Sequence, residues 1–354
     1  MNLTKEDTNI LKGIALLMLL CHHLFYTKNG LYDDIYVYND YGLVWMISMA
    51  CKTCVALFCF LSGYGLTASI EKTNKINWKS FYLKRFIVLF SNYWLMWILF
   101  VPLGIFLFDR TFNDVYGNPF LGKLILDFFG LLNCIGQYGY NPTWWFYSCI
   151  ILLYLLFPII LVSTKKRIYS LMLLCSSLAL IFLPCGPLYP IKYYLFPFIL
   201  GCFFRNGVIF NLMPSSFSKF IKKIVGGSLN RWGVIGILFL ILLYIPLRII
   251  LPYSLILDTG WALLWIIFYI NTPFNRYFKA PLNVCGKHSF NIFLFHTFIF
   301  YLYFNELIYW SSNPVICMVM LTISSLIISQ LIEKGKKFFG YNFIISKYKN
   351  NLSL

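Results

Sequence analysis

The chain of 354 residues is 60% hydrophobic and 20% aromatic, and only 12% of its residues are charged. A water-soluble domain carries about 25% charged residues because its surface faces water. This composition, with a mean hydropathy of +0.74, excludes a soluble enzyme and predicts an integral membrane protein. A net charge of +17 would point to nucleic acid for a soluble protein. In a membrane protein the distribution of basic residues instead indicates how the chain is oriented across the membrane. No nucleic-acid partner is therefore expected.

Apolar segments recur along the whole chain, and a helix needs about 20 such residues to cross a bilayer. We predict a single all-α membrane domain over residues 1–354, a polytopic transmembrane helical bundle of about ten helices. A shorter apolar segment at 121–134 is expected to form a re-entrant or interfacial helix, and residues 333–354 a basic cytoplasmic tail. The predicted spans are 10–27, 43–66, 86–108, 144–163, 168–184, 190–204, 232–251, 255–270, 289–308 and 314–332.

The basic residues are distributed unevenly between the two sides of these spans. Of the 29 Lys and Arg residues, 23 fall on the side of the termini and 6 on the opposite side. Basic residues concentrate in cytoplasmic connections, so both termini are predicted to be cytoplasmic, in a multi-pass protein of the cytoplasmic membrane. The six residues on the outer side are Lys28, Lys52, Arg110, Lys123, Lys192 and Arg248.

The eleven cysteines fall mostly inside predicted spans, where they are expected to pack as small apolar side chains. Cys51-Lys-Thr-Cys54 has the spacing of a redox pair, but no thioredoxin-like pattern surrounds it. Metal-ligand spacings, phosphate loops and serine-nucleophile elbows are absent from the sequence. No metal and no permanently bound cofactor are therefore expected.

The first predicted helix carries ionisable residues near both of its ends. Lys12 and His23 are eleven residues apart, and at about 100° per residue they return to nearly the same helix face. At a rise of about 1.5 Å per residue they stand roughly 16 Å apart along the axis. Such groups inside a span usually face a cavity or a partner. The plainer interpretation is that Lys12 reaches lipid phosphates and His23 bonds a neighbouring helix.

Together with that pair, four further motifs occur in an order that resembles acyltransferase family 3, the integral membrane acyltransferases that include O-acetyltransferases of bacterial surface polysaccharides. The resemblance runs from about residue 10 to 300. The motifs are Lys12 with His23, the Phe-rich segment Phe58–Tyr64 containing Ser62-Gly63, the basic pair Lys84-Arg85, the helix from Trp144 to Pro158, and the Ser289–His296 segment.

The sequence also departs from the family pattern at three positions. The family often has a second arginine on its third helix, followed by a proline, where this chain has Val88 and Ser91. Many members carry a glutamate in the Trp-Phe helix, where this chain has Ile150. These differences affect the expected contacts with the acyl donor and the choice of subfamily more than they affect the assignment to this class of acyltransferases.

The resemblance implies transfer of an acyl group, usually acetyl, from cytoplasmic acyl-CoA to a hydroxyl of a cell-surface glycan or lipid-linked sugar. His23 would be the general base, although a transient acyl-histidine is an open alternative. The residues expected to hold the acyl-CoA donor are Lys12, Ser62, Gly63, Lys84 and Arg85, and those expected to contact substrate are Trp145, Ser289 and His296.

Two alternatives to this interpretation stay open on the sequence alone. Ser289 and His296 lie seven residues apart on one helix face, which also suits an interhelical hydrogen-bond cluster. A non-acylating polysaccharide polymerase, a flippase or a small-molecule transporter is also a multi-helix membrane protein. The sequence gives neither the acceptor nor the oligomeric state.

Overall fold

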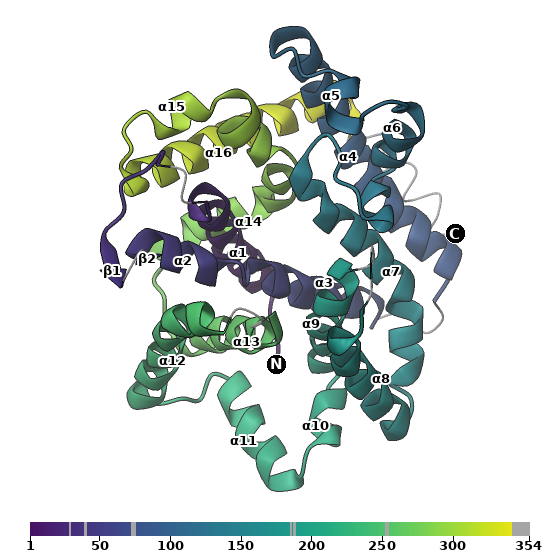
Figure 1. The fold of residues 1–354 in the computed structure, drawn as a ribbon. Coiled ribbons are helices and arrows are strands. Elements are labelled where there is room, and N and C mark those ends of the chain that lie inside the picture. Colours follow the sequence, from purple (N-terminus) through teal and green to yellow (C-terminus); the bar gives the residue numbers. More distant parts are fainter. Residues whose placement is uncertain are drawn as a thin grey trace.

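The computed structural model describes residues 1–27, 30–38, 41–71, 76–184, 186, 189–251 and 255–341. Helices form nearly all of the regular structure in these segments (Figure 1). The described strands are β1 (Tyr36–Tyr38) and β2 (Tyr41–Gly42), which pair antiparallel in the connection between α1 and α2. The predicted helical class is therefore confirmed, with one short hairpin that the sequence did not indicate.

The described helices vary widely in length. Short 3-10 segments η1 (Leu132–Ile135), η2 (Pro142–Trp144) and η3 (Leu180–Phe182) and the π-helix η5 (Phe298–Tyr303) join or extend them. The α-helices are α1 (Lys5–Phe25), α2 (Leu43–Cys51), α3 (Cys54–Ile70), α4 (Trp78–Leu107), α5 (Phe112–Tyr116), α6 (Leu121–Phe128), α7 (Trp145–Ser163), α8 (Arg167–Ala179), α9 (Tyr189–Arg205), α10 (Val208–Leu212), α11 (Ser215–Val225), α12 (Arg231–Ile250), α13 (Leu255–Asn271), α14 (Arg276–Thr297), α15 (Asn305–Tyr309) and α16 (Pro314–Phe338).

Every predicted span coincides with one to three consecutive helical segments. Within the described residues, six helical segments are long and apolar enough to cross a membrane by themselves, and α8 with η3 and most of α13 form shorter apolar helices. Six crossings are thus supported by length and composition. The count of about ten and the cytoplasmic placement of the termini stay predictions.

Several helices extend beyond the predicted limits, because basic residues interrupt the apolar pattern without interrupting the helix. Helix α4 begins at Trp78, where the Asn77 side chain accepts a hydrogen bond from the Ser80 N–H at 3.0 Å. Helix α14 likewise begins at Arg276. Helix α16 continues to Phe338, so the predicted tail at 333–354 starts as helix. Its last part, residues 342–354, lies outside the described residues.

Three predicted segments are broken where one continuous helix was expected. The span at 289–308 contains the end of α14, then η5 and, after Phe304, α15. The span at 43–66 consists of α2 and α3, separated by a turn at Lys52 and Thr53. The segment at 121–134 consists of α6 and η1, separated by Gly130 with a positive φ of 67°. Only glycine adopts that conformation at little cost, which explains the interruption.

Helix α1 lies near the centre of the ribbon, with α2, α3 and α14 beside it (Figure 1). Its closest approach to α14 is at Gly13 and Gly286. A Cβ atom on Gly13 would collide with the Leu282 carbonyl, and one on Gly286 with the Asn9 carbonyl. The two backbones are therefore in direct contact, as small residues allow in membrane bundles.

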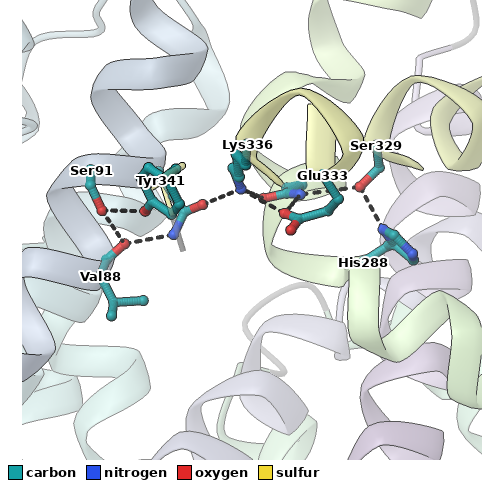
Figure 2. Close-up of polar contacts among 9 residues, drawn as sticks. Val88, Ser91, His288, Ser329, Glu333, Lys336 and Tyr341 are labelled. Carbon is teal, nitrogen blue, oxygen red and sulfur yellow. Dashed lines mark hydrogen bonds and ion pairs between the residues drawn. The ribbon is translucent and has the colours of Figure 1, made fainter. Parts of the chain in front are cut away.

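A polar network joins α4, α14 and α16 around the buried Lys336 (Figure 2). The Lys336 ammonium donates to Glu333 Oε1 at 2.6 Å and to Asn92 Oδ1 at 2.5 Å. Asn291 donates to the same Glu333 oxygen at 2.8 Å, and His288 Nδ1 lies 2.8 Å from Ser329 Oγ. Lys336 was assigned from sequence to the cytoplasmic tail, but here its charge is paired inside the bundle.

The glycine contact between α1 and α14 gives a prediction about stability. Gly13→Ala places a methyl group against the Leu282 carbonyl, and overpacking of this kind costs about 1–3 kcal/mol. We expect a lower midpoint of thermal unfolding for the detergent-purified protein. The matched control is Gly65→Ala in α3, where a Cβ meets nothing within 4 Å. An equal midpoint for both variants would contradict the contact.

Candidate active site

His23 and His296 lie next to one another at the same level of the bundle. Ten residues lead from Gly13 to His23, and ten from Gly286 to His296. Because α1 and α14 are in contact at the two glycines, an equal rise of about 15 Å along parallel helices brings both histidines together. Their ring centroids are 5.1 Å apart. The ring of Phe300 stacks on His296 at 5.9 Å.

Hydrogen bonds fix which ring nitrogens of the neighbouring histidines are engaged. His296 Nδ1 lies 3.0 Å from the carbonyl oxygens of both Ile292 and Phe293. Carbonyls only accept, so this nitrogen carries the hydrogen, and Nε2 of the neutral ring has the lone pair. His22 Nδ1 donates to the Ser48 carbonyl at 2.9 Å in the same way. His22 thereby ties α1 to α2.

A cavity of about 640 Å³ opens beside His22 and His23, while His296 is fully buried and is not among the described residues that line it. His22 and His23 form one wall, and Thr297 contributes from the end of α14. Six of the other lining residues are aromatic, and they provide flat apolar faces with a few polar groups between them. The aromatic residues that line the cavity are Tyr26, Tyr138, Trp145, Tyr194, Phe300 and Tyr301.

The start of α7 is fastened to α14 by buried hydrogen bonds, and this places Trp145 at the cavity. The Trp144 indole N–H donates to the Leu294 carbonyl at 2.9 Å, and the hydroxyls of Thr143 and Thr297 are 3.1 Å apart. Trp145 then lies against Tyr194 of α9, with ring centroids 5.8 Å apart. The structure therefore brings His23, His296 and Trp145 into one region, although the sequence places them in three distant segments.

A second group of predicted residues gathers near the other end of α1. Lys12 lies within electrostatic range of Arg85 on α4. Arg85 also stands over the Phe81 ring at 5.6 Å and within electrostatic range of Tyr154. Tyr154 of α7 in turn hydrogen bonds Ser62 of α3. Helices α1, α3, α4 and α7 thus contribute to a region with basic and hydroxyl side chains, which lies toward the N-terminal end of α1 from His23.

The other predicted site residues have different surroundings. Gly63 packs against α9, where a Cβ would meet the Phe198 carbonyl, and its own carbonyl accepts from Thr67 Oγ1 at 3.0 Å. Its mid-helix backbone serves helix packing and offers no open donor for a phosphate. The Ser289 hydroxyl donates to the Gly286 carbonyl at 2.8 Å, and Ser289 is not among the residues lining the cavity. Lys84 is half-buried on α4 next to Arg85.

Sequence reasoning missed several residues of the cavity. Lys52 lines it from the turn between α2 and α3, and Tyr194 lines it from α9. In the sequence, Lys52 was counted among the six basic residues of the outer side and lies within the Cys51–Cys54 spacing, and it was not assigned to a site. Those thiols form no disulfide, and Cys51 hydrogen bonds Cys21 of α1. No cluster of potential metal ligands occurs in the described part of the chain.

The connection between α4 and α7 is anchored around the buried carboxyl group of Asp127. Its Oδ2 accepts from the Tyr116 hydroxyl at 2.5 Å and from the Tyr140 N–H at 2.8 Å. The Asp127 carbonyl accepts from the Tyr93 hydroxyl of α4 at 2.5 Å. One residue therefore holds α5, α6 and the segment that leads to Trp145. Burial raises the pKa of Asp127 to about 6, although the two donors to its carboxyl oppose that shift.

Together, the helical membrane fold and the paired histidines beside a cavity define an integral membrane protein with a candidate group-transfer site. Residues 6–334 match the acyltransferase domain, which covers nearly the whole chain. The chain belongs to acyltransferase family 3, as the sequence resemblance indicated. No curated protein and no solved structure was found to match it.

Asp127 gives a prediction about pH. Its folded-state pKa of about 6 lies above the value of about 3.9 for an exposed aspartate. The folded protein therefore binds this proton more tightly, and the free energy of unfolding should fall as pH rises from about 4 to 6, by on the order of 2 kcal/mol. From about one pH unit above the folded-state pKa this contribution is constant.

The measurement is the thermal unfolding midpoint between pH 4 and 7.5 for the wild type and for Asp127→Asn. The amide oxygen still accepts hydrogen bonds but does not titrate, so the variant should lack this part of the pH dependence. Identical pH profiles for the two proteins would show that Asp127 titrates as an ordinary exposed carboxyl.

Proposed function

We propose that the protein moves an acetyl or other short acyl group from cytoplasmic acyl-CoA to a hydroxyl of a cell-surface glycan or lipid-linked sugar. The observation that carries this proposal is the pairing of His23 with His296 beside an aromatic cavity. The basic region at Lys12 and Arg85 lies roughly 16 Å below on the same helix bundle. That separation suits a donor with a phosphate-bearing head and a long thioester arm.

The donor is expected to lie with its phosphates at the basic region. Lys12, Lys84 and Arg85 supply charge-assisted hydrogen-bond donors. The repulsion between Lys12 and Arg85 is relieved when an anion lies between them. The Ser62 hydroxyl, which faces Tyr154, adds a neutral donor on the route toward the histidines. Acyl-CoA is a substrate in this scheme, and no permanently bound cofactor takes part.

The chemistry at the histidines is proton transfer coupled to attack on the thioester. His23 takes the proton of the acceptor hydroxyl, and the hydroxyl oxygen forms a bond to the acyl carbon. The carbon–sulfur bond then breaks, and the CoA thiolate receives the proton that His23 holds. His296 keeps Nδ1 on two backbone carbonyls, so Nε2 is the nitrogen left to interact with His23, and it also lies 3.5 Å from the Thr297 hydroxyl oxygen. In the competing acyl-histidine route, His23 forms the bond to the acyl carbon first.

The aromatic wall supports a sugar as the acceptor. Trp145 and Tyr194 present neighbouring ring faces in the cavity, and such faces suit the apolar side of a sugar ring. Thr143 and Thr297 provide hydroxyls at the same wall. The partners in this proposal are the lipid bilayer, the glycan and the acyl-CoA, and the location is the cytoplasmic membrane.

Removal of His23 tests the proton-transfer step. In membranes supplied with radiolabelled acetyl-CoA and candidate glycans, His23→Ala should label the glycan about 10²–10⁴-fold more slowly, the usual contribution of a general base. The matched control is His288→Gln, which changes a histidine outside the cavity and keeps a group able to bond Ser329. Equal labelling by wild type and His23→Ala would remove His23 from the mechanism. No labelling by any of the three would favour a polymerase, flippase or transporter.

Removal of Lys12 tests the donor site separately. Lys12→Ala should raise the KM for acetyl-CoA about ten-fold while kcat changes little, because the lost contact binds the donor equally in the ground and transition states. The control is Lys165→Ala, which removes an exposed lysine between α7 and α8. An unchanged KM in Lys12→Ala would exclude Lys12 as a phosphate contact.

A further inference from the structure

Among the described residues that line the cavity beside His22 and His23, one belongs to the Lys, Arg, Asp and Glu types, and it is Lys52. Lys52 lies in the turn between α2 and α3, lines the cavity together with His22 and His23, and is within electrostatic range of both. Hydrogen bonds between α1 and α2 fix the height of Lys52 along the bundle. His22 hydrogen bonds the Ser48 carbonyl, and Cys21 hydrogen bonds Cys51. Lys52 therefore lies in the same layer of the bundle as the histidines.

A buried ion pair lies behind this lysine. Arg248 of α12 and Asp258 of α13 approach to 3.7 Å, and their side chains are 3% and 2% exposed. The Tyr244 hydroxyl also donates to Asp258. Lys52 is within electrostatic range of both charges of the pair. The layer thus combines two cations with one carboxylate, and the carboxylate is held by Arg248 and Tyr244.

Lys52 itself lacks a carboxylate partner at ion-pair distance in the described segments. A lone ammonium in a low-dielectric layer is costly, and such groups usually face a water-filled cavity or a substrate pathway. The other described residues around the cavity are neutral or are histidines. An anion that entered the cavity would therefore gain a charge-assisted contact without displacing an internal partner.

We propose that Lys52 binds a negatively charged group of the acceptor, so that the preferred acceptor is an acidic glycan. The group is a sugar carboxylate or a phosphate ester, and either one matches a single ammonium donor. The proposal rests on the acyl-transfer function, because it assigns the anion to the molecule whose hydroxyl is acylated. The aromatic wall then holds the sugar ring, and Lys52 sets which hydroxyl lies near His23.

The test is equilibrium binding of three probes to the detergent-purified full chain, followed by tryptophan fluorescence. The probes are methyl glucoside, methyl glucuronide and glucose 1-phosphate, which share one ring and differ in charge. At least one anionic probe should bind about ten-fold more tightly than methyl glucoside. Comparison of methyl glucuronide with glucose 1-phosphate shows whether the site prefers a carboxylate or a phosphate ester. Lys52→Gln should abolish the preference, and Lys52→Arg should keep it.

Two controls separate this site from general charge effects and from misfolding. Lys192→Gln removes an outer lysine that does not line the cavity, and the acidic preference should persist in it. Retained acetyl-CoA binding shows that each variant is folded. Equal binding of all three probes to the wild type would overturn the proposal, as would an acidic preference that survives in Lys52→Gln.

Acyl transfer from labelled acetyl-CoA is measured in parallel on neutral and acidic glycans. If Lys52→Gln slows transfer equally to both, Lys52 acts on the reacting carbonyl, and the acceptor-charge proposal is wrong. If no transfer occurs but the acidic preference still depends on Lys52, the anion site stands and the acyltransferase proposal fails. If Lys52→Gln loses transfer to the acidic glycan and keeps transfer to the neutral one, the result supports the acyltransferase function and the role of Lys52 in binding an anionic acceptor.

Discussion

The backbone contact between α1 and α14 is the constraint on which the candidate site depends. Gly13 and Gly286 let the two helices touch, and from that contact the parallel helices rise in step to His23 and His296. A larger side chain at either glycine would separate the histidines as well as the helices. The α7 start is then bonded to the Leu294 carbonyl of α14, so the aromatic wall is positioned by the same helix.

The ionisable groups are arranged in layers. A charge in an apolar environment is energetically unfavourable, and the surroundings of the charged groups differ from one layer to the next. Lys336 is paired with Glu333 and two asparagines in a closed network (Figure 2). Lys12 and Arg85 repel one another at one end of the bundle. Lys52 faces the cavity beside a separate ion pair. The closed network stabilises helix packing, whereas the two open arrangements are suited to anionic ligands.

Motif order predicted the family, and it named residues that the structure brings together at two levels of the helix bundle. A motif names a position but not the side of the helix that a neighbour covers, so it could not predict the surroundings of Gly63 and Ser289. Gly63 faces α9, and Ser289 bonds its own helix. It also missed Tyr194 and Thr297, which are ordinary residues in the sequence and acquire a role only through the helices packed beside them.

The sequence alone determined the membrane class, the helical segments and the placement of Lys12 and His23 on one helix face, because hydropathy and helical periodicity are local properties. It also carried the family relationship, since motif order is readable along the chain. Tertiary structure decided that His296 meets His23, that Lys336 lies inside the bundle and that Lys52 opens on the cavity. These facts depend on contacts between residues far apart in the chain, and no local pattern encodes which helices come to lie side by side.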